Sequence, residues 1–396
     1  MRKIKTTLLL LIPVLMLSAC AKKTVKEDIT VYQIPTTAKP AEAAQSAKKE
    51  IKKPVILTFA GDLMAHDSNT RMKDYSLIYK GIKEITLADD LSFLNVETPV
   101  YDEKDFKGYP RFNVKKEYPD AAIAAGFDVF TVANNHTNDQ GEDGVKATYE
   151  YFEKKRKDNI YFAGIRKDKE DIISYELIEV KGWKILFAAV TEFYNKNDDS
   201  GRVDVARSWP AARREFKKRI KKLREDNPAD LFVLAVHSYE AEYELEVKEK
   251  RSDYFKELLA AGVDVVWGGH PHVPQRWESV KNKETGTPEK AIIYSLGNFV
   301  SGQRYKINYK HPDDHKQYTG DSFLLQFIFE EKDGKPAILN VIPVIITSHM
   351  RLDEDKQKYY TVERLTGEFA DSNPDALADY YIKRIELMEK IIKESI

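Results

Sequence analysis

The chain has 396 residues, of which 42% are hydrophobic and 32% charged, enough apolar material for one large α/β domain or two smaller ones. Its 63 basic and 64 acidic residues nearly cancel, which excludes a strongly positive overall field and argues against a nucleic acid partner. A single cysteine, Cys20, excludes a disulfide framework and argues against a thiolate metal site.

The N-terminal residues have the pattern of a secretory signal peptide. A basic head (residues 2–5) precedes an apolar run over residues 8–17, which is too short to cross a bilayer as a helix. The Leu-Ser-Ala-Cys sequence that ends at Cys20 resembles the lipobox of bacterial lipoproteins, which implies cleavage after residue 19 and a diacylglycerol on the Cys20 sulfur. We therefore expect a lipid anchor on the outer face of the cell membrane. The alternative is an ordinary secretory peptide.

The chain after the signal peptide divides into three expected parts. Residues 20–53 carry many lysines and only scattered apolar side chains, so we expect a lipid-anchored, disordered tether. We expect the main domain over residues 54–350, and a C-terminal helical extension packed on it over residues 351–396.

From residue 54 onward, short apolar runs alternate with amphipathic segments. The expected strands cover residues 55–60, 91–96, 127–133, 160–163, 175–180, 183–190, 231–236, 263–267, 291–296, 322–329 and 337–346. The expected helices cover residues 117–125, 144–155, 209–224, 252–261 and 374–392. Lys181-Gly182 and Asp333-Gly334 predict the tight turns of two hairpins. This alternation predicts an α/β protein, and the hairpins predict mixed sheets.

Carboxylate, amide and imidazole side chains lie just past the ends of the apolar strands. They are Asp62, Glu97, Asn135, His237, His270 and His272. Such strand ends gather at one edge of a layered α/β protein, where sites form. Oxygen and imidazole donors suit divalent cations such as Mn, Zn or Fe, and one shared carboxylate could join two ions. Each residue also has a structural alternative, as a helix cap, a turn residue or a hydrogen-bonded histidine.

Three histidines support this interpretation through their neighbours. His270 and His272 follow two glycines, and the alternation of a strand would send both imidazoles to the same side. His136 directly follows Asn135, so its side chain diverges and is available for acid–base chemistry. Asp139 could accept from the His136 ring and fix its tautomer. The alternative for His136 is a solvated turn histidine.

Five motifs, in this order, resemble those of CapA-type capsule synthesis proteins, the poly-γ-glutamate biosynthesis proteins of bacteria. They are Gly61-Asp62-Leu63-Met64, Asn95-Val96-Glu97-Thr98-Pro99, Ala133-Asn134-Asn135-His136 with Asp139 and Gly141, Gly268-Gly269-His270-Pro271-His272, and Tyr294-Ser295-Leu296-Gly297-Asn298-Phe299. The resemblance covers roughly residues 55–300. It implies a fold similar to calcineurin-like metallophosphoesterases, a mixed β-sandwich of two sheets flanked by helices in four layers. It also implies that the six residues above take the metal-ligand positions and that His136 takes the general-acid position.

The sequence departs from the metallophosphoesterase pattern in two places. Met64 stands where those enzymes have a first-strand histidine, and a thioether does not replace imidazole on such ions. We do not expect His66 to reach the site instead, so one ion would be weakly held or absent. The family's usual His-Trp-Gly turn is His237-Ser238-Tyr239 here, which leaves Glu240 and Glu242 unplaced.

Three further residues are candidates for substrate contact. Arg304 lies in a long polar loop over residues 301–320, a length common in functional loops. Asn298 precedes that loop, and Arg111 is a third candidate. An anionic polymer or a phosphate would suit the arginines.

These features leave three functional interpretations. The preferred one is a membrane-tethered accessory of capsule assembly that handles poly-γ-glutamate together with membrane-embedded capsule synthase components. The others are a metal-dependent phosphoester hydrolase at the cell surface and a non-catalytic polymer-binding module. The first is favoured because the capsule motifs match more closely than the metallophosphoesterase motifs, and the sequence leaves open whether the protein is an enzyme.

Overall fold

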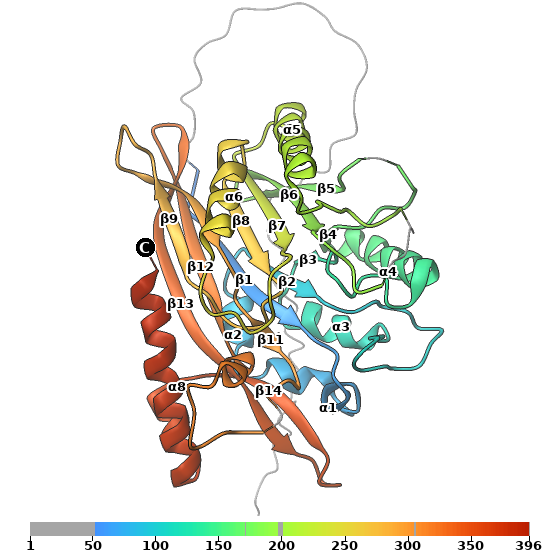
Figure 1. Ribbon diagram of the computed structural model, residues 1–396, viewed down its shortest axis with the longest axis vertical. Helices are drawn as coiled ribbons and strands as arrows, with labels where there is room; N and C mark the ends of the chain where they lie inside the picture. Colours follow the sequence, from blue (N-terminus) through green and yellow to red (C-terminus); the bar gives the residue numbers. More distant parts are fainter. Residues whose placement is uncertain (1–51, 171, 197–200, 305, 396) are drawn as a thin grey trace, which may run out of the picture. The chain divides into compact units, whose positions relative to one another are not determined.

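The computed structural model describes residues 52–170, 172–196, 201–304 and 306–395 (Figure 1). These residues all belong to one structural unit, Glu42–Ile396. The predicted signal peptide, Cys20 and almost all of the predicted tether lie outside the described residues. Within the described ranges, no helix combines the length and the apolar character needed to cross a membrane.

The first sheet has eight strands. Their order is β14-β13-β12-β1-β2-β3-β4, and β11 pairs with β1 at one end. The strands are β1 (Val55–Leu63), β2 (Leu91–Val96), β3 (Val129–Thr131), β4 (Tyr161–Ala163), β11 (Asn298–Val300), β12 (Asp321–Lys332), β13 (Lys335–Leu352) and β14 (Lys358–Arg364). Strands β1 to β4 run parallel, whereas β12, β13 and β14 pair antiparallel. The parallel strands therefore end at a common edge.

The second sheet has six strands in the order β5-β6-β7-β8-β10-β9. They are β5 (Tyr175–Val180), β6 (Trp183–Thr191), β7 (Leu231–His237), β8 (Val265–Gly269), β9 (Trp277–Lys281) and β10 (Pro288–Ile293). Strands β6, β7, β8 and β10 run parallel, and the outer strands pair antiparallel. The sheet is thus mixed, as the hairpins predicted.

Helices connect and cover the strands. The α-helices are α1 (Asp67–Thr70), α2 (Lys83–Thr86), α3 (Glu117–Ala124), α4 (Gly141–Lys155), α5 (Pro210–Asp226), α6 (Glu249–Ala260), α7 (Gly367–Asp371) and α8 (Asp375–Glu394). Short 3₁₀ helices are η1 (Tyr75–Tyr79), η2 (Arg156–Asp158) and η3 (His315–Gly320). Two of the helices, α5 and α6, place apolar side chains such as Phe216 and Leu258 against the outer face of the second sheet.

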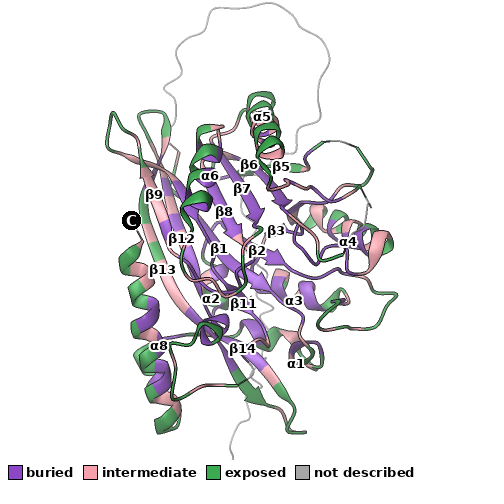
Figure 2. Ribbon diagram, in the orientation of Figure 1, coloured by how far each residue is buried: buried purple, intermediate pink, exposed green. Residues whose placement is uncertain are grey.

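The two sheets pack face to face through large aromatic side chains. The ring of Phe93 on β2 lies 5.6 Å from Phe187 on β6 and 6.1 Å from Trp267 on β8. Phe59 on β1 lies 5.7 Å from the same tryptophan. Every residue of the inner strands β2 and β7 is buried (Figure 2). The predicted α/β fold, a mixed two-sheet sandwich flanked by helices, is confirmed.

Local sequence signals account for both predicted hairpins. Lys181 and Gly182 have φ of 49° and 79°, and Asp333 and Gly334 have φ of 51° and 76°. Two-residue turns with positive φ at both positions match the twist of the strands they join. The predicted strands and helices are present, with shifts of a few residues at their ends.

The C-terminal part differs from the expectation of a helical extension that starts at residue 351. Strand β13 runs through Leu352, and β14 adds a further strand to the first sheet. Only α7 and α8 are helical, and α8 runs alongside β13 (Figure 1). Strands β9 and β11 were also not predicted, because β11 has only three residues and β9 has a half-exposed pattern.

Candidate metal centre

Strands from both sheets bring the predicted ligands to one buried cluster. Asp62 lies near the end of β1, Glu97 directly follows β2, and His237 ends β7. The Asp62, Glu97, Asn135, His237, His270 and His272 side chains are all buried. The convergence expected of parallel strand ends is therefore found within and between the two sheets.

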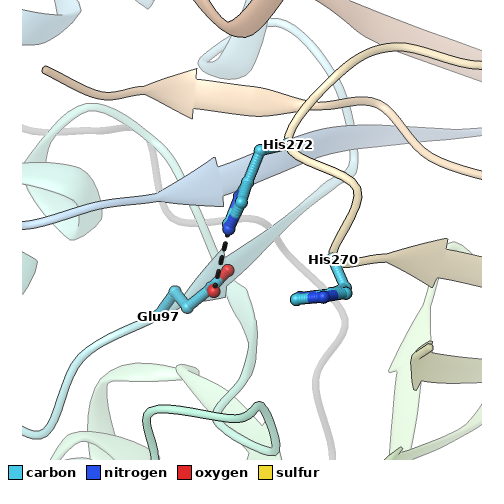
Figure 3. Close-up of side chains that lie close together, drawn as sticks. All are labelled: Glu97, His270 and His272. Atoms are coloured by element: carbon cyan, nitrogen blue, oxygen red, sulfur yellow. Dashed lines mark ion pairs between the residues drawn. The ribbon is translucent and has the colours of Figure 1, made fainter. Parts of the chain in front are cut away.

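Glu97 lies at the centre of the cluster. Its Oε1 atom is 3.8 Å from His237 Nε2 and 3.7 Å from His272 Nε2. Figure 3 shows the Glu97 carboxylate below the ring of His272, with His270 farther along the same loop. Asp62 Oδ2 lies 3.1 Å from Nδ1 of His272, so this imidazole is between two carboxylates.

Asn95 holds the two carboxylates in position. Its Nδ2 donates to Asp62 Oδ1 at 2.8 Å and to Glu97 Oε2 at 3.1 Å, and its Oδ1 accepts from Asn134 Nδ2 at 3.2 Å. The sequence prediction did not select Asn95, although it lies two residues before Glu97 and so faces the same side of β2. That alternation was the available signal.

Asn135 joins the first sheet to the second. Its Oδ1 lies 2.7 Å from His237 Nε2. His270 packs edge-on against Phe193, with ring centres 4.8 Å apart, and lies 5.1 Å from the ring of His237. Phe193 therefore forms an apolar wall on the histidine side of the cluster.

The segment after β8 reaches the cluster through a turn. His270 and His272 have φ of 101° and 59°. Positive φ is unfavourable for residues with a side chain, and such strain is concentrated at functional sites. Both imidazoles reach the cluster, as predicted. Strand alternation does not orient them, however, because the backbone leaves the extended conformation at His270.

Burial controls the electrostatics of the cluster. Burial, and then the Asp62 carboxylate, raises the pKa of Glu97 well above its usual range. Burial, followed by the neighbouring imidazoles, lowers the pKa of His237 and that of His270 well below the ordinary histidine value. The imidazoles of His237 and His270 are therefore neutral near pH 7, which is the form that binds a metal ion.

The donor set fits a divalent cation. Two groups of side chains place one donor atom each within 4.8 Å of one another: Glu97 with His270 and His272, and Asp62 with Glu97 and His237. Glu97 belongs to both groups. Its Oε1 and the Nδ1 of His270 are buried without a hydrogen-bond partner. Buried polar atoms are normally paired. A cation bound between these two atoms would give both of them a partner, and carboxylate oxygen and imidazole nitrogen are suitable ligands.

His136 and Asp139 form a buried pair beside the cluster. His136 Nδ1 lies 2.7 Å from Asp139 Oδ2, and the backbone N–H of Phe112 donates to the same oxygen at 2.8 Å. The ring of Phe112 lies 4.7 Å from the imidazole, and Asn195 Nδ2 lies 3.1 Å from its Nε2. The predicted orientation of His136 by Asp139 is therefore present. Asn195 comes from the loop after β6, where no sequence motif indicates a functional residue.

The three predicted substrate contacts have different surroundings. Arg304 is buried and donates to Asp321 Oδ1 at 2.6 Å, so its guanidinium has a structural role and the predicted substrate contact is wrong. Asn298 is buried beside Asp62 in the β1–β11 pairing and donates to the backbone oxygen of His272 at 3.3 Å. Arg111 is exposed next to Phe112.

The structure also shows where the residues lie that depart from the metallophosphoesterase pattern. Met64 is buried in the core. His66 belongs to neither group of donors among the described residues. Glu240 lies 3.6 Å from Arg251 Nε, and Glu242 is exposed but close enough to contribute to the raised pKa of Glu97.

Comparison with known proteins assigns the family. Residues 56–303 match the family described as bacterial capsule synthesis protein PGA_cap. The chain belongs to the PGA_cap family. The PGA_cap region contains Asp62, Glu97 and the other four predicted ligands, together with Asn298. Strands β12 to β14 and helices α7 and α8 lie outside it.

Two similar proteins from Bacillus species are both named CapA. The chain is 27% identical over 318 residues to the capsule biosynthesis protein CapA of Bacillus anthracis, covering 77% of this chain and 71% of that protein. It is 29% identical over 252 residues to the PGA biosynthesis protein CapA of Bacillus subtilis, covering 62% of this chain and 63% of that protein. A solved structure, the calcineurin-like phosphoesterase YfkN of Bacillus subtilis, is similar at 12% identity and a TM-score of 0.39, covering 75% of this chain and 91% of that chain.

Proposed function

We propose that this protein takes part in the synthesis or export of a poly-γ-glutamate capsule polymer, and that it does so with one or two divalent cations bound around Glu97. Membership of the PGA_cap family supports the capsule role. The unpartnered Glu97 Oε1, buried among imidazoles of the second sheet, is the observation that carries the cation. The proposal includes a lipid anchor at Cys20 on the outer face of the membrane, where the protein would work beside membrane-embedded synthase components.

The two donor groups define how cations would be held. One ion would use Glu97 with His270 and His272, and the other would use Glu97 with Asp62 and His237. A cation such as Mn, Zn or Fe supplies Lewis-acid chemistry toward an anionic oxygen when bound. Asn95 fixes the carboxylates, and Phe193 shields the imidazoles from water.

A second candidate function is hydrolysis of a phosphoester. The specific observation in its favour is the buried pair of His136 and Asp139, because a histidine oriented by a carboxylate can move a proton at Nε2. The same residues would also serve in a capsule reaction that needs a proton donor. A non-catalytic polymer-binding module would need neither this pair nor a cation.

Complementation in the native bacterium tests the capsule role. The chromosomal copy is deleted, and the wild type, Glu97→Gln and Cys20→Ser forms are each returned at equal expression. We expect γ-linked glutamate at the cell surface to disappear on deletion, to return with the wild type, and to stay low with Glu97→Gln. A deletion strain that still exports its polymer would overturn the capsule role.

Two controls separate the parts of the proposal. Glu176→Gln removes a buried carboxylate on β5, the edge strand of the second sheet, where it pairs with Arg156 away from the cluster, so this form should restore the polymer fully. Membrane fractionation of the Cys20→Ser form tests the anchor, because this form should be released from the membrane. Retention of Cys20→Ser in the membrane would contradict the lipid anchor while leaving the capsule role intact.

A further inference from the structure

His66 is a half-buried histidine that the candidate metal centre does not use. It follows β1 by three residues, and its backbone oxygen accepts from the N–H groups of Asn69 and Thr70 at 2.8 and 3.1 Å. These bonds fix the backbone at this position. The Nδ1 atom of the ring is buried without a hydrogen-bond partner.

The ring of His66 packs next to the acid–base pair. Phe112 contacts it edge-on, with ring centres 5.4 Å apart, and the same phenylalanine contacts His136 at 4.7 Å. On the other side, the backbone at Gly302 is so close that a Cβ added there would lie 2.9 Å from His66 Cβ. The imidazole is therefore confined between the Phe112 segment and the loop that follows β11.

The His66 ring also interacts electrostatically with two histidines of the site. Burial, followed by the nearby imidazoles of His272 and His136 in that order, lowers its pKa to about 4. His272 belongs to the cation cluster, whereas His136 belongs to the acid–base pair. A neutral imidazole thus lies close to both, and it is not one of the convergent metal donors.

We infer that His66 is a substrate-contacting residue, whose imidazole hydrogen-bonds to an oxygen of the anionic group held by the cation cluster, on the side toward His136. This inference rests on the proposed function, because the cluster carries buried carboxylates and would repel an anion without a cation. An imidazole that lies next to the donor groups, but outside them, suits a ligand oxygen better than a metal ion. The anionic group is a carboxylate or a phosphoryl group, which share this chemistry.

Binding measurements on manganese-loaded protein test the inference. The manganese content of every sample is measured first. Binding of two probes, inorganic phosphate and γ-glutamylglutamate, is then measured by calorimetry. His66→Phe keeps a ring against Phe112 but removes the hydrogen bond, whereas His66→Asn keeps a polar atom near the position of Nδ1. The matched control is His311→Phe, which removes an exposed imidazole.

We expect His66→Phe to keep its manganese and to weaken binding of one probe roughly tenfold to a hundredfold, the range of a hydrogen bond to a charged group. His66→Asn should weaken it less, and His311→Phe should leave it unchanged. Weaker binding of phosphate would identify the anionic group of the substrate as phosphoryl, and weaker binding of γ-glutamylglutamate would identify it as a carboxylate. Loss of manganese from His66→Phe would make His66 a ligand, and wild-type affinity for both probes would exclude the contact. Each result overturns the inference. Wild-type protein that takes up no manganese would instead contradict manganese as the cation of the proposed function at the first measurement.

Discussion

Replacing Glu97 by glutamine should change stability in opposite directions with and without a cation. Glu97 is fully buried, its Oε1 has no hydrogen-bond partner, and Asp62 lies nearby. In metal-free protein, the isosteric Glu97→Gln replaces a carboxyl whose ionised form is disfavoured by burial with a side chain that carries no charge. Relieving an unsatisfied buried group is worth about 1–3 kcal/mol, so we expect the metal-free variant to be more stable than the wild type by that amount.

The same substitution should remove stabilisation by manganese. A ligand present at a hundred times its dissociation constant stabilises the folded state by about 2.7 kcal/mol. Glu97 belongs to both donor groups, so its loss should weaken binding at least a hundredfold. At the same manganese concentration, the variant would then gain only about 0.4 kcal/mol.

Urea unfolding in chelator and in manganese measures both effects. Glu176→Gln is the control, because it removes a buried carboxylate away from the cluster and should keep the full manganese effect. A Glu97→Gln protein that is less stable than the wild type in chelator would refute the electrostatic argument. An unchanged manganese effect would refute the assignment of Glu97 as a shared ligand.

Three other predictions concern neighbouring parts of the structure. Any aryl-phosphate hydrolysis by manganese-loaded protein should fall about 10²- to 10⁴-fold in His136→Ala with manganese content unchanged, and a rate equal to the wild type would exclude His136 as the acid. Arg384→Met should lower the free energy of unfolding by about 3 kcal/mol, because the wholly buried guanidinium pairs with the buried Asp321, and a loss below about 1 kcal/mol would show that this pair contributes little. Burial lowers the pKa of His349 to about 4, so the unfolded chain binds its proton first and stability falls as pH drops from 6.5 to 4. His349→Gln should make this fall shallower by up to about 3 kcal/mol, and unfolding curves with the wild-type pH dependence would contradict it.

The sequence predicted the strands and the principal site because both depend on local patterns. An apolar run followed by Asp62, Glu97 or His237 predicts both a buried strand and the position where that strand ends. Parallel topology then brings these ends together. The hairpin turns at Lys181-Gly182 and Asp333-Gly334 were equally local, since two residues fix their backbone.

What the sequence did not predict depends on contacts distant in the chain. Arg304 resembles a surface residue because its loop is polar, and its partners Asp321 and Thr347 are supplied by β12 and β13. Asn195 reaches His136 only through the arrangement of the two sheets. Strand β14 does have a local signal, because Tyr360 and Val362 alternate along it as buried apolar residues.

The central claim is that side chains from both sheets bind a cation around Glu97. Anomalous scattering from crystals soaked in manganese tests it most directly, with data collected on both sides of the manganese absorption edge. We predict one or two manganese peaks in contact with the Glu97 carboxylate and with imidazoles of the second sheet. Manganese peaks found only at surface carboxylates, with the Glu97 carboxylate free of any peak, would contradict it.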